Sequence, residues 1–144
     1  MLNYVKKVRQ DLQIPELELN LPKTQAYILH ELESLPCQVE SPIASSVIAY
    51  FDNHKDSTIA FRSDMDALPV SEKNEVPYKS QHEGKMHACG HDCHIAMLLG
   101  GIRLLMAQKE QLKGNVKIIF QAAEESCHGA QYYVEHGFLD DVNA

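Results

Sequence analysis

The sequence has 144 residues, of which 44% are hydrophobic and 23% are charged, and this places it in the range of one globular domain with one substantial core. Its 20 acidic and 13 basic residues give a formal net charge of -7 without any run of Lys or Arg, which argues against nucleic acids and anionic membranes as partners. The expected partner is a small molecule or a cation.

Two short amphipathic helices are predicted in the N-terminal part of the chain. The first covers residues 4–12 and ends before Pro15, and the second covers residues 23–35, where apolar side chains recur at helical spacing. The segment around the first helix mixes basic and apolar side chains but lacks the apolar core of a secretory signal. The expected location is therefore the cytoplasm, where cysteines stay reduced.

A β-hairpin is predicted next. Residues 47–51 and 58–61 are runs of β-branched and aromatic side chains, separated by turn-forming residues at 52–56. Residues 72–86 are polar and contain Pro77, so they are predicted to form a loop that is long enough to have a functional role. This loop returns the chain to a cluster of histidines.

The C-terminal half is predicted to alternate between helix and strand. The spacing of apolar residues predicts a helix over 94–112, buried on one side and ending before Gly114. The apolar run 116–120 is typical of a strand covered on both faces, and a last helix is expected at 129–136. The fold class that follows is α/β, with a layered mixed sheet flanked by helices and with ligand-binding groups at the strand ends.

Two further features limit the class of protein. The longest apolar stretch, residues 95–106, is interrupted by glycine and arginine and is too short to span a bilayer, so no membrane segment is predicted. Four cysteines are too few for a disulfide scaffold. Cys37 is interpreted as a small buried hydrophobic residue, whereas the other three cysteines lie among histidines, where they can have a chemical role.

The strongest candidate for chemistry is the segment from His87 to His94, which holds three imidazoles, two thiols and a carboxylate in eight residues. Thiolate and imidazole suit zinc, manganese, cobalt or iron, and Gly90 allows a tight turn that directs Cys89 and His91 toward one centre. A structural zinc site built with Cys93 and a redox pair of Cys89 and Cys93 remain as alternatives.

Two pairs of carboxylates follow predicted strands. Glu124 and Glu125 come just after residues 116–120, and one of them can bind a metal while the other moves protons. Asp64 and Asp66 follow residues 58–61 and share one face of an extended backbone, from which they can orient metal-bound imidazoles. A solvated acidic turn is the alternative for the glutamates, and turn chemistry before a proline is the alternative for the aspartates.

Three motifs taken in order resemble the M20 metallopeptidase family: residues 61–69, 82–94 and 119–125. The nearest branch contains amidohydrolases such as N-acyl-amino-acid hydrolases, hippurate hydrolases, auxin-conjugate hydrolases and N-acetyldiaminopimelate deacetylases. Ordered motifs at plausible spacing are much more specific than one motif alone.

The resemblance implies a role for each matched residue. Cys89, His91 and Glu125 match metal ligands, and Glu124 matches the general base that activates the attacking water. Asp64 and Asp66 match the acidic motif of the active site, to which we assign supporting roles. The resemblance also implies two divalent ions (manganese, zinc, cobalt or nickel), an N-acyl amino acid or small N-acylated peptide as substrate, and a complete protein that is a homodimer or a monomer.

The sequence departs from the family pattern in composition and in length. It has no His within residues 11–14, and Cys93 and residues 126–128 stand where the family usually has small residues. Family members also continue with a dimerisation domain and the C-terminal part of the catalytic domain. Residues 1–144 are therefore expected to be the N-terminal part of an incomplete zinc-peptidase-like domain that is inactive alone. The alternative is a truncated, noncatalytic metal-binding or interaction module that self-associates.

Overall fold

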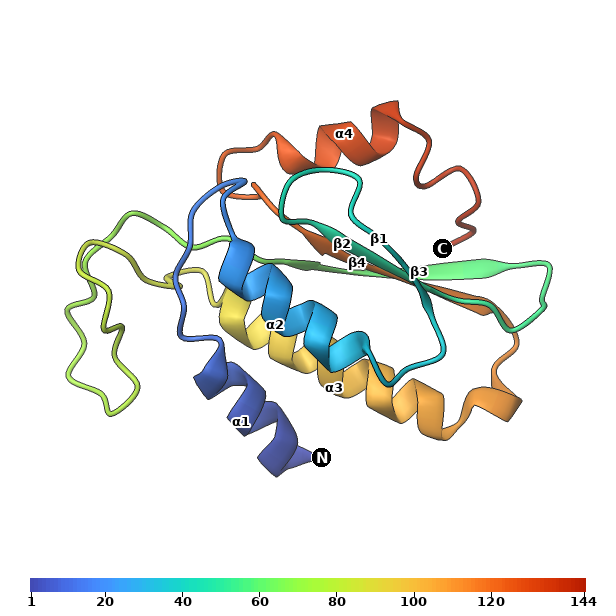
Figure 1. Ribbon diagram of the computed structural model, residues 1–144, viewed down its shortest axis with the longest axis horizontal. Helices are drawn as coiled ribbons and strands as arrows, with labels where there is room; N and C mark the ends of the chain where they lie inside the picture. Colours follow the sequence, from blue (N-terminus) through green and yellow to red (C-terminus); the bar gives the residue numbers. More distant parts are fainter.

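The computed structural model describes residues 1–144 and has three layers, with helices on both faces of a four-stranded sheet (Figure 1). In chain order the elements are α1 (Leu2–Asp11), α2 (Pro22–Leu32), β1 (Gln38–Glu40), β2 (Val47–Phe51), β3 (Thr58–Asp64), α3 (His91–Ala107), a 3-10 turn (Lys109–Gln111), β4 (Asn115–Gln121) and α4 (Gly129–Glu135). The layered α/β fold predicted from the sequence is confirmed.

The sheet has the order β1-β2-β4-β3, with β2 antiparallel and β3 parallel to β4. Every residue of β4 is buried, so this strand needs a neighbour on each side. The predicted hairpin of β2 and β3 is therefore wrong, because β4 lies between the two strands.

The side chain of Asn115 explains how the chain passes from β2 to β3 across the end of β4. Its Oδ1 accepts hydrogen bonds from the backbone N–H groups of Asn53 (3.0 Å) and Lys55 (3.2 Å), and its Nδ2 donates to the carbonyl of Lys55 (2.8 Å). The turn that we expected to close a hairpin is thus fastened to the first residue of the central strand.

Several element boundaries also differ from those expected. The long helix begins earlier, at His91, because Gly90 has the positive φ of 79° from which the chain turns into α3. β3 extends to Asp64 because its whole length pairs with β4. The short edge strand β1 was not expected from its sequence, and it forms by antiparallel pairing with β2.

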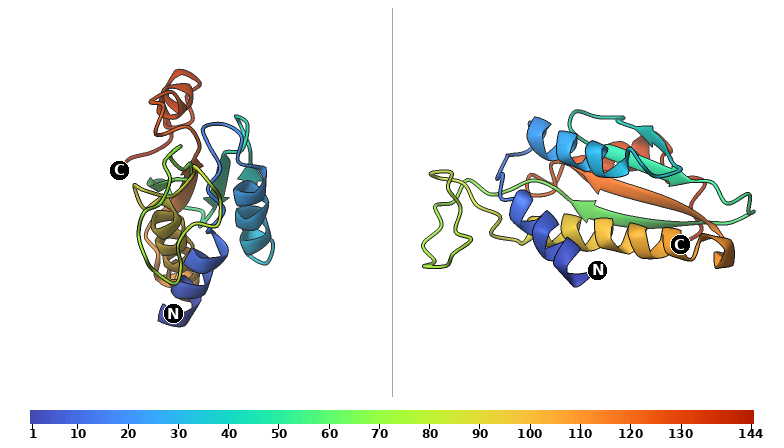
Figure 2. Two further views of the ribbon diagram at one scale, coloured as in Figure 1. Left: turned by 90° about the vertical axis from the view of Figure 1, so that its left-hand side faces the viewer. Right: turned by 60° about the horizontal axis from the view of Figure 1, so that its bottom comes forward.

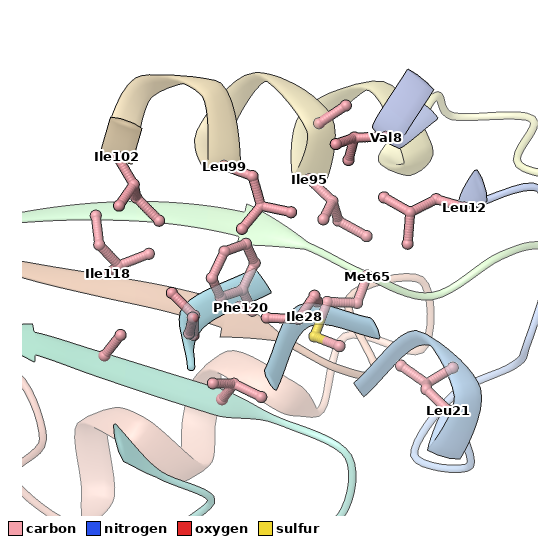
Figure 3. Packing of buried hydrophobic residues seen from close by; sticks show 14 of the residues in the cluster. Val8, Leu12, Leu21, Ile28, Met65, Ile95, Leu99, Ile102, Ile118 and Phe120 are labelled. Atoms are coloured by element: carbon pink, nitrogen blue, oxygen red, sulfur yellow. The ribbon is translucent and has the colours of Figure 1, made fainter. Parts of the chain in front are cut away.

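The main core lies between the sheet and the three helices α1, α2 and α3 (Figure 3). Ile95, Leu99 and Ile102 point from α3 toward Ile118 and Phe120 of β4, and all five are buried. On the opposite face, α4 covers the sheet through a smaller cluster made by Tyr133, Ile48 and Ile119. Figure 2 shows α4 alone on its side of the sheet. Both faces of the sheet are therefore covered.

The parallel pairing of β3 and β4 determines where functional groups gather. Asp64, the last residue of β3, lies opposite Gln121, the last residue of β4. The chain leaves β3 into a long loop that extends beyond the sheet and returns to His91 at the start of α3 (Figure 1). The polar motifs at 64–66, 89–91 and 124–125 thus meet at one edge of the sheet, as expected for α/β folds. No helix of this fold has both the length and the apolar composition needed to cross a bilayer.

Candidate metal centre

Three predicted ligand residues converge at this edge of the sheet. One donor atom each of Cys89, His91 and Glu125 lies within 4.8 Å of the other two. Cys89 is exposed in the turn before α3, His91 is the buried first residue of α3, and Glu125 is partly buried in the turn after β4. The structure therefore brings together residues from two stretches that are more than thirty positions apart.

The orientation of His91 leaves one ring nitrogen available to a metal. Its Nδ1 lies 2.7 Å from the backbone carbonyl of Asp66, and because a carbonyl oxygen only accepts, Nδ1 must carry the hydrogen. In the neutral ring, Nε2 then keeps its lone pair, and this atom lies 3.8 Å from Oε1 of Glu125. Metal-binding histidines are commonly fixed in this way by a carbonyl or carboxylate behind the ring.

The carboxylate of Asp66 fixes the turn that carries both glutamates. Its Oδ1 accepts the backbone N–H of Glu124 (3.0 Å), and its Oδ2 accepts that of Glu125 (3.1 Å). Asp66 is buried, so these two N–H groups compensate for the loss of water around its charge. We expected Asp66 to orient an imidazole, and it does so through its carbonyl, while its side chain holds the glutamate turn.

The backbone of the glutamate turn adopts an uncommon conformation. Ala123 and Cys127 have positive φ angles of 57° and 61° although neither is glycine, and such conformations are disfavoured for residues with a Cβ. The N–H of Ala123 donates to the carbonyl of Glu18 at 3.0 Å, which holds the start of the turn against the segment after α1. The turn is thus maintained by its contacts rather than by local preference.

The two glutamates have different surroundings. The side chain of Glu124 is 37% exposed and that of Glu125 is 18% exposed. Oε1 of Glu125 is buried without a hydrogen-bond partner, close to Cys89 and His91. A bound cation would satisfy this oxygen, whereas the more open Glu124 can exchange protons with water. Oε2 of Glu124 lies 3.8 Å from Nε2 of His91, so both carboxylates adjoin the same centre.

Asp64 joins a second group of possible ligands with His91 and His94. Nδ1 of His94 lies 2.5 Å from Oδ1 of Asp64, and Nη1 of Arg62 donates to Oδ2 at 3.2 Å. Burial raises the pKa of Asp64, but the hydrogen bond from His94, the positive charge that His91 has when it is protonated, and the charge of Arg62 outweigh it, so the pKa lies below its ordinary value. His94 was not among the ligands predicted from the sequence, although its position three residues after His91 on a helix indicates a shared face.

The donor set fits a divalent metal. Thiolate, imidazole and carboxylate together suit zinc, cobalt or manganese, and the unpaired oxygen of Glu125 is directed at the same point. Cys93 belongs to neither group of candidate ligands, and all four cysteines are free. The geometry therefore favours the mixed site over a structural zinc site or redox pair that uses Cys93. Five further histidines are exposed and belong to neither group of candidate ligands: His30, His54, His82, His128 and His136.

In the metal-free chain, the thiol of Cys89 should ionise only at a higher pH than an ordinary cysteine. Interaction of the thiol with the adjacent Glu125 carboxylate, followed by desolvation and the charges of Glu125, Glu124 and Asp64, raises its pKa to about 11, from an ordinary value of 9.0. Because the thiolate is the nucleophile, alkylation of Cys89 should be slow at pH 8 and accelerate toward pH 11. Replacing Glu125 by Gln should lower this pKa and speed alkylation at pH 8.

Mass spectrometry of the alkylated peptides, performed in the presence of a chelator, measures this effect. The exposed Cys127 serves as the internal reference for reagent reactivity. An equal rate for Cys89 with and without the Glu125 carboxylate would disprove the influence of Glu125 on the thiol.

A model of the peptidase family M20/M25/M40 matches residues 60–144 of this chain. An uncharacterised hydrolase of Staphylococcus aureus is 44% identical over 142 residues, which cover 96% of this chain and 37% of the relative. An IAA-amino acid hydrolase of Arabidopsis thaliana is 41% identical over 143 residues, which cover 98% of this chain and 31% of the relative. The chain thus spans between 31% and 37% of the length of these two relatives.

Two solved structures also resemble this chain over nearly its whole length. The YXEP protein of Bacillus subtilis, a dinuclear metal-binding peptidase of the M20 family, superposes with a TM-score of 0.90 at 38% identity, over 97% of this chain and 40% of its own. A putative aminohydrolase from methicillin-resistant Staphylococcus aureus superposes with a TM-score of 0.91 at 35% identity, over 97% of this chain and 37% of its own.

Proposed function

Because the chain belongs to the peptidase family M20/M25/M40, we propose that it forms the N-terminal part of the catalytic domain of a metal-dependent amidohydrolase. The reaction is hydrolysis of the amide bond of an N-acyl amino acid or a small N-acylated peptide. The observation that carries this proposal is the convergence of Cys89, His91 and Glu125, with Glu124 beside them.

Cys89, His91 and Glu125 are proposed to hold a divalent ion, with two ions (manganese, zinc, cobalt or nickel) in the complete site. When bound, the metal polarises the scissile carbonyl and increases the acidity of the attacking water. The Bacillus subtilis neighbour is a dinuclear metal-binding peptidase, which supports this assignment.

Glu124 is proposed as the general base. Its more open carboxylate takes a proton from water and then gives it to the nitrogen of the departing amine. Asp66 holds Glu124 and Glu125 in position through their backbone N–H groups, and Asp64 orients His94 beside His91. These are the supporting roles that we assign to the two aspartates.

The proposed substrate class is supported by the relatives. One of them is an IAA-amino acid hydrolase, and one structural neighbour is a putative aminohydrolase. The formal net charge of -7 without a run of Lys or Arg also supports a small-molecule substrate, rather than a nucleic acid or an anionic membrane, as the partner. The four free cysteines support the cytoplasm as the proposed location.

The rest of the catalytic domain, to which the chain returns after an inserted dimerisation domain, is proposed to pack against β3. This strand pairs with only one strand, β4, and a hollow of about 670 Å³ lies between β3 and α3. Phe61, Met97 and Leu104 line the hollow and are more than 40% exposed. The limited coverage of both structural neighbours also supports a longer protein, for which a homodimer or a monomer is the proposed assembly.

The proposed function is tested by metal binding and by hydrolysis. Titration of this chain with Mn²⁺, Zn²⁺ and Co²⁺ should show binding that is lost when Cys89 is replaced by Ser. The protein encoded by the whole reading frame, loaded with Mn²⁺, should release amino acids from N-acetyl and longer N-acyl substrates, and a chelator should stop the reaction.

Three results would count against this function. Failure of both the chain and the longer protein to bind any of these metals would remove the proposed site. Metal binding without hydrolysis of any N-acyl substrate by the longer protein, or a reading frame that stops at Ala144, would favour a noncatalytic metal-binding or interaction module. If the chain is such a noncatalytic module, it is expected to self-associate through its exposed apolar hollow, which a simple measurement of its oligomeric state would detect.

A further inference from the structure

Arg9 connects three segments of the chain next to the candidate metal centre. Its Nε donates to Oδ2 of Asp92, the second residue of α3, at 2.9 Å. Its guanidinium carbon lies 4.5 Å from the centre of the Tyr78 ring, in the loop that leads from β3 to α3. Arg9 itself belongs to α1, so one side chain contacts α1, the loop and the first turn of α3.

Asp92 depends on these contacts because its carboxylate is buried. The residue is 1% exposed, and its Oδ2 accepts a second hydrogen bond from Nε2 of Gln13 at 2.7 Å. Its Oδ1 has no hydrogen-bond partner, and neither ring nitrogen of the nearby His87 has one. A buried carboxylate without a cation is strongly destabilising, and Arg9 is the cation that forms an ion pair with it.

The position of Asp92 bears directly on the ligands. Asp92 follows His91, and the turn from His87 to Gly90 that contains Cys89 precedes them both. Two N–H groups of the first turn of α3, those of Cys93 and His94, donate to the carbonyl of Gly90. A shift of Asp92 would therefore move the helix start and the Cys89 turn together.

We propose that Arg9 is a positioning residue for the metal ligands Cys89 and His91. Its ion pair with Asp92 fixes the first turn of α3, and its contact with Tyr78 fixes the loop that approaches this turn. Arg9 belongs to neither group of candidate ligands, so it acts through Asp92. This inference rests on the proposed metal site and adds to it a residue from a distant part of the chain.

The chain offers a matched control in Arg103. Nη2 of Arg103 donates to Glu31 at 2.7 Å, and its guanidinium carbon lies 4.4 Å from the centre of the Tyr4 ring. It thus combines the same two kinds of contact as Arg9, and it links the same helices α1 and α3, together with α2. It has no contact with the metal-binding turn. Loss of Arg103 measures what such an arginine contributes to stability alone.

The experiment compares four proteins: the unmodified chain, Arg9→Gln, Arg9→Lys and Arg103→Gln. Titration with Co²⁺, followed through its d–d and thiolate charge-transfer absorption, gives the metal affinity. Arg9→Gln is expected to weaken Co²⁺ binding by about 10-fold or more, the typical effect of losing a group that supports a ligand. Arg9→Lys, which keeps the charge, should recover part of the affinity, and Arg103→Gln should bind Co²⁺ like the unmodified chain.

Hydrogen exchange in the metal-free proteins gives a second readout. The N–H groups of Cys93 and His94 should exchange faster in Arg9→Gln but not in Arg103→Gln. Thermal unfolding with a chelator reports the stability of each protein, and the double variant with Asp92→Asn avoids leaving a buried charge if Arg9→Gln does not fold.

The outcomes separate the two proposals. Unchanged Co²⁺ affinity and exchange in Arg9→Gln, or equal losses in Arg103→Gln, would overturn the positioning role while leaving the metal site intact. If the unmodified chain does not bind Co²⁺, the metal site fails instead. The exchange rates at Cys93 and His94 then decide alone whether Arg9 orders this turn.

Discussion

Replacing Glu124 by Gln is expected to lower kcat for N-acyl substrates by about 10²- to 10⁴-fold in the protein that contains this segment, which is the usual contribution of a general base. Gln has nearly the same shape but cannot accept a proton from water. Metal content should stay near normal, because Glu124 is not among the clustered donors Cys89, His91 and Glu125. Steady-state kinetics together with metal analysis measure the two effects.

Glu125→Gln is the matched control, because the two residues are adjacent and the substitution is the same. Glu125 has the unpaired buried oxygen beside Cys89 and His91, so this variant should lose both metal and activity. Retained turnover in Glu124→Gln would contradict its role as base. Loss of metal in Glu124→Gln would instead place this residue among the ligands.

The site could be predicted from the sequence to the extent that strand ends determine it. Asp64 and Glu124 follow hydrophobic runs that are recognisable locally, and the carboxyl ends of adjacent parallel strands lie at one edge of a sheet. Cys89 and His91 lie close in sequence and precede a helix with clear periodicity. The convergence of these groups could therefore be predicted once the fold class was correctly predicted.

The pairing of the strands could not be predicted in the same way. A turn-forming segment between two β-branched runs favours a hairpin locally, yet β4 inserts between β2 and β3 because its seven buried residues need neighbours on both sides. The network around Asp92 was missed for a similar reason. Arg9 and Asp92 are separated by 83 positions, and no local pattern links them.

The hydrogen bonds of the Asp66 side chain could not be predicted from the sequence. Its position near the site followed from its place after a strand, but its hydrogen bonds to the N–H groups of Glu124 and Glu125 depend on the left-handed conformation of Ala123. A left-handed alanine is not expected from sequence. The geometry of the glutamate turn is therefore a property of the folded chain that only the structure reveals.

Replacing Gly129 by Ala is expected to destabilise the chain and to displace the glutamate turn. A Cβ at this position would lie 1.9 Å from the carbonyl oxygen of Ala122, which is backbone and cannot rotate away. The N–H of Gly129 also donates to the carbonyl of Ala123 at 3.1 Å, so movement of the α4 start weakens the bond that closes the turn. Overpacking usually costs about 1–3 kcal/mol, and the rigid obstacle places this variant at the upper end.

Gly101→Ala provides the control, because a Cβ there has no atom within 4 Å and lies within α3. In that position Ala should stabilise the chain by about 0.5–1 kcal/mol through its higher helix propensity. Urea unfolding of both variants gives the free energies. Metal titration should show weakened binding only in Gly129→Ala, because the turn between Ala122 and Gly129 contains Glu125. A Gly129→Ala chain with normal stability and metal affinity would show that the close approach to Ala122 is not required for the site.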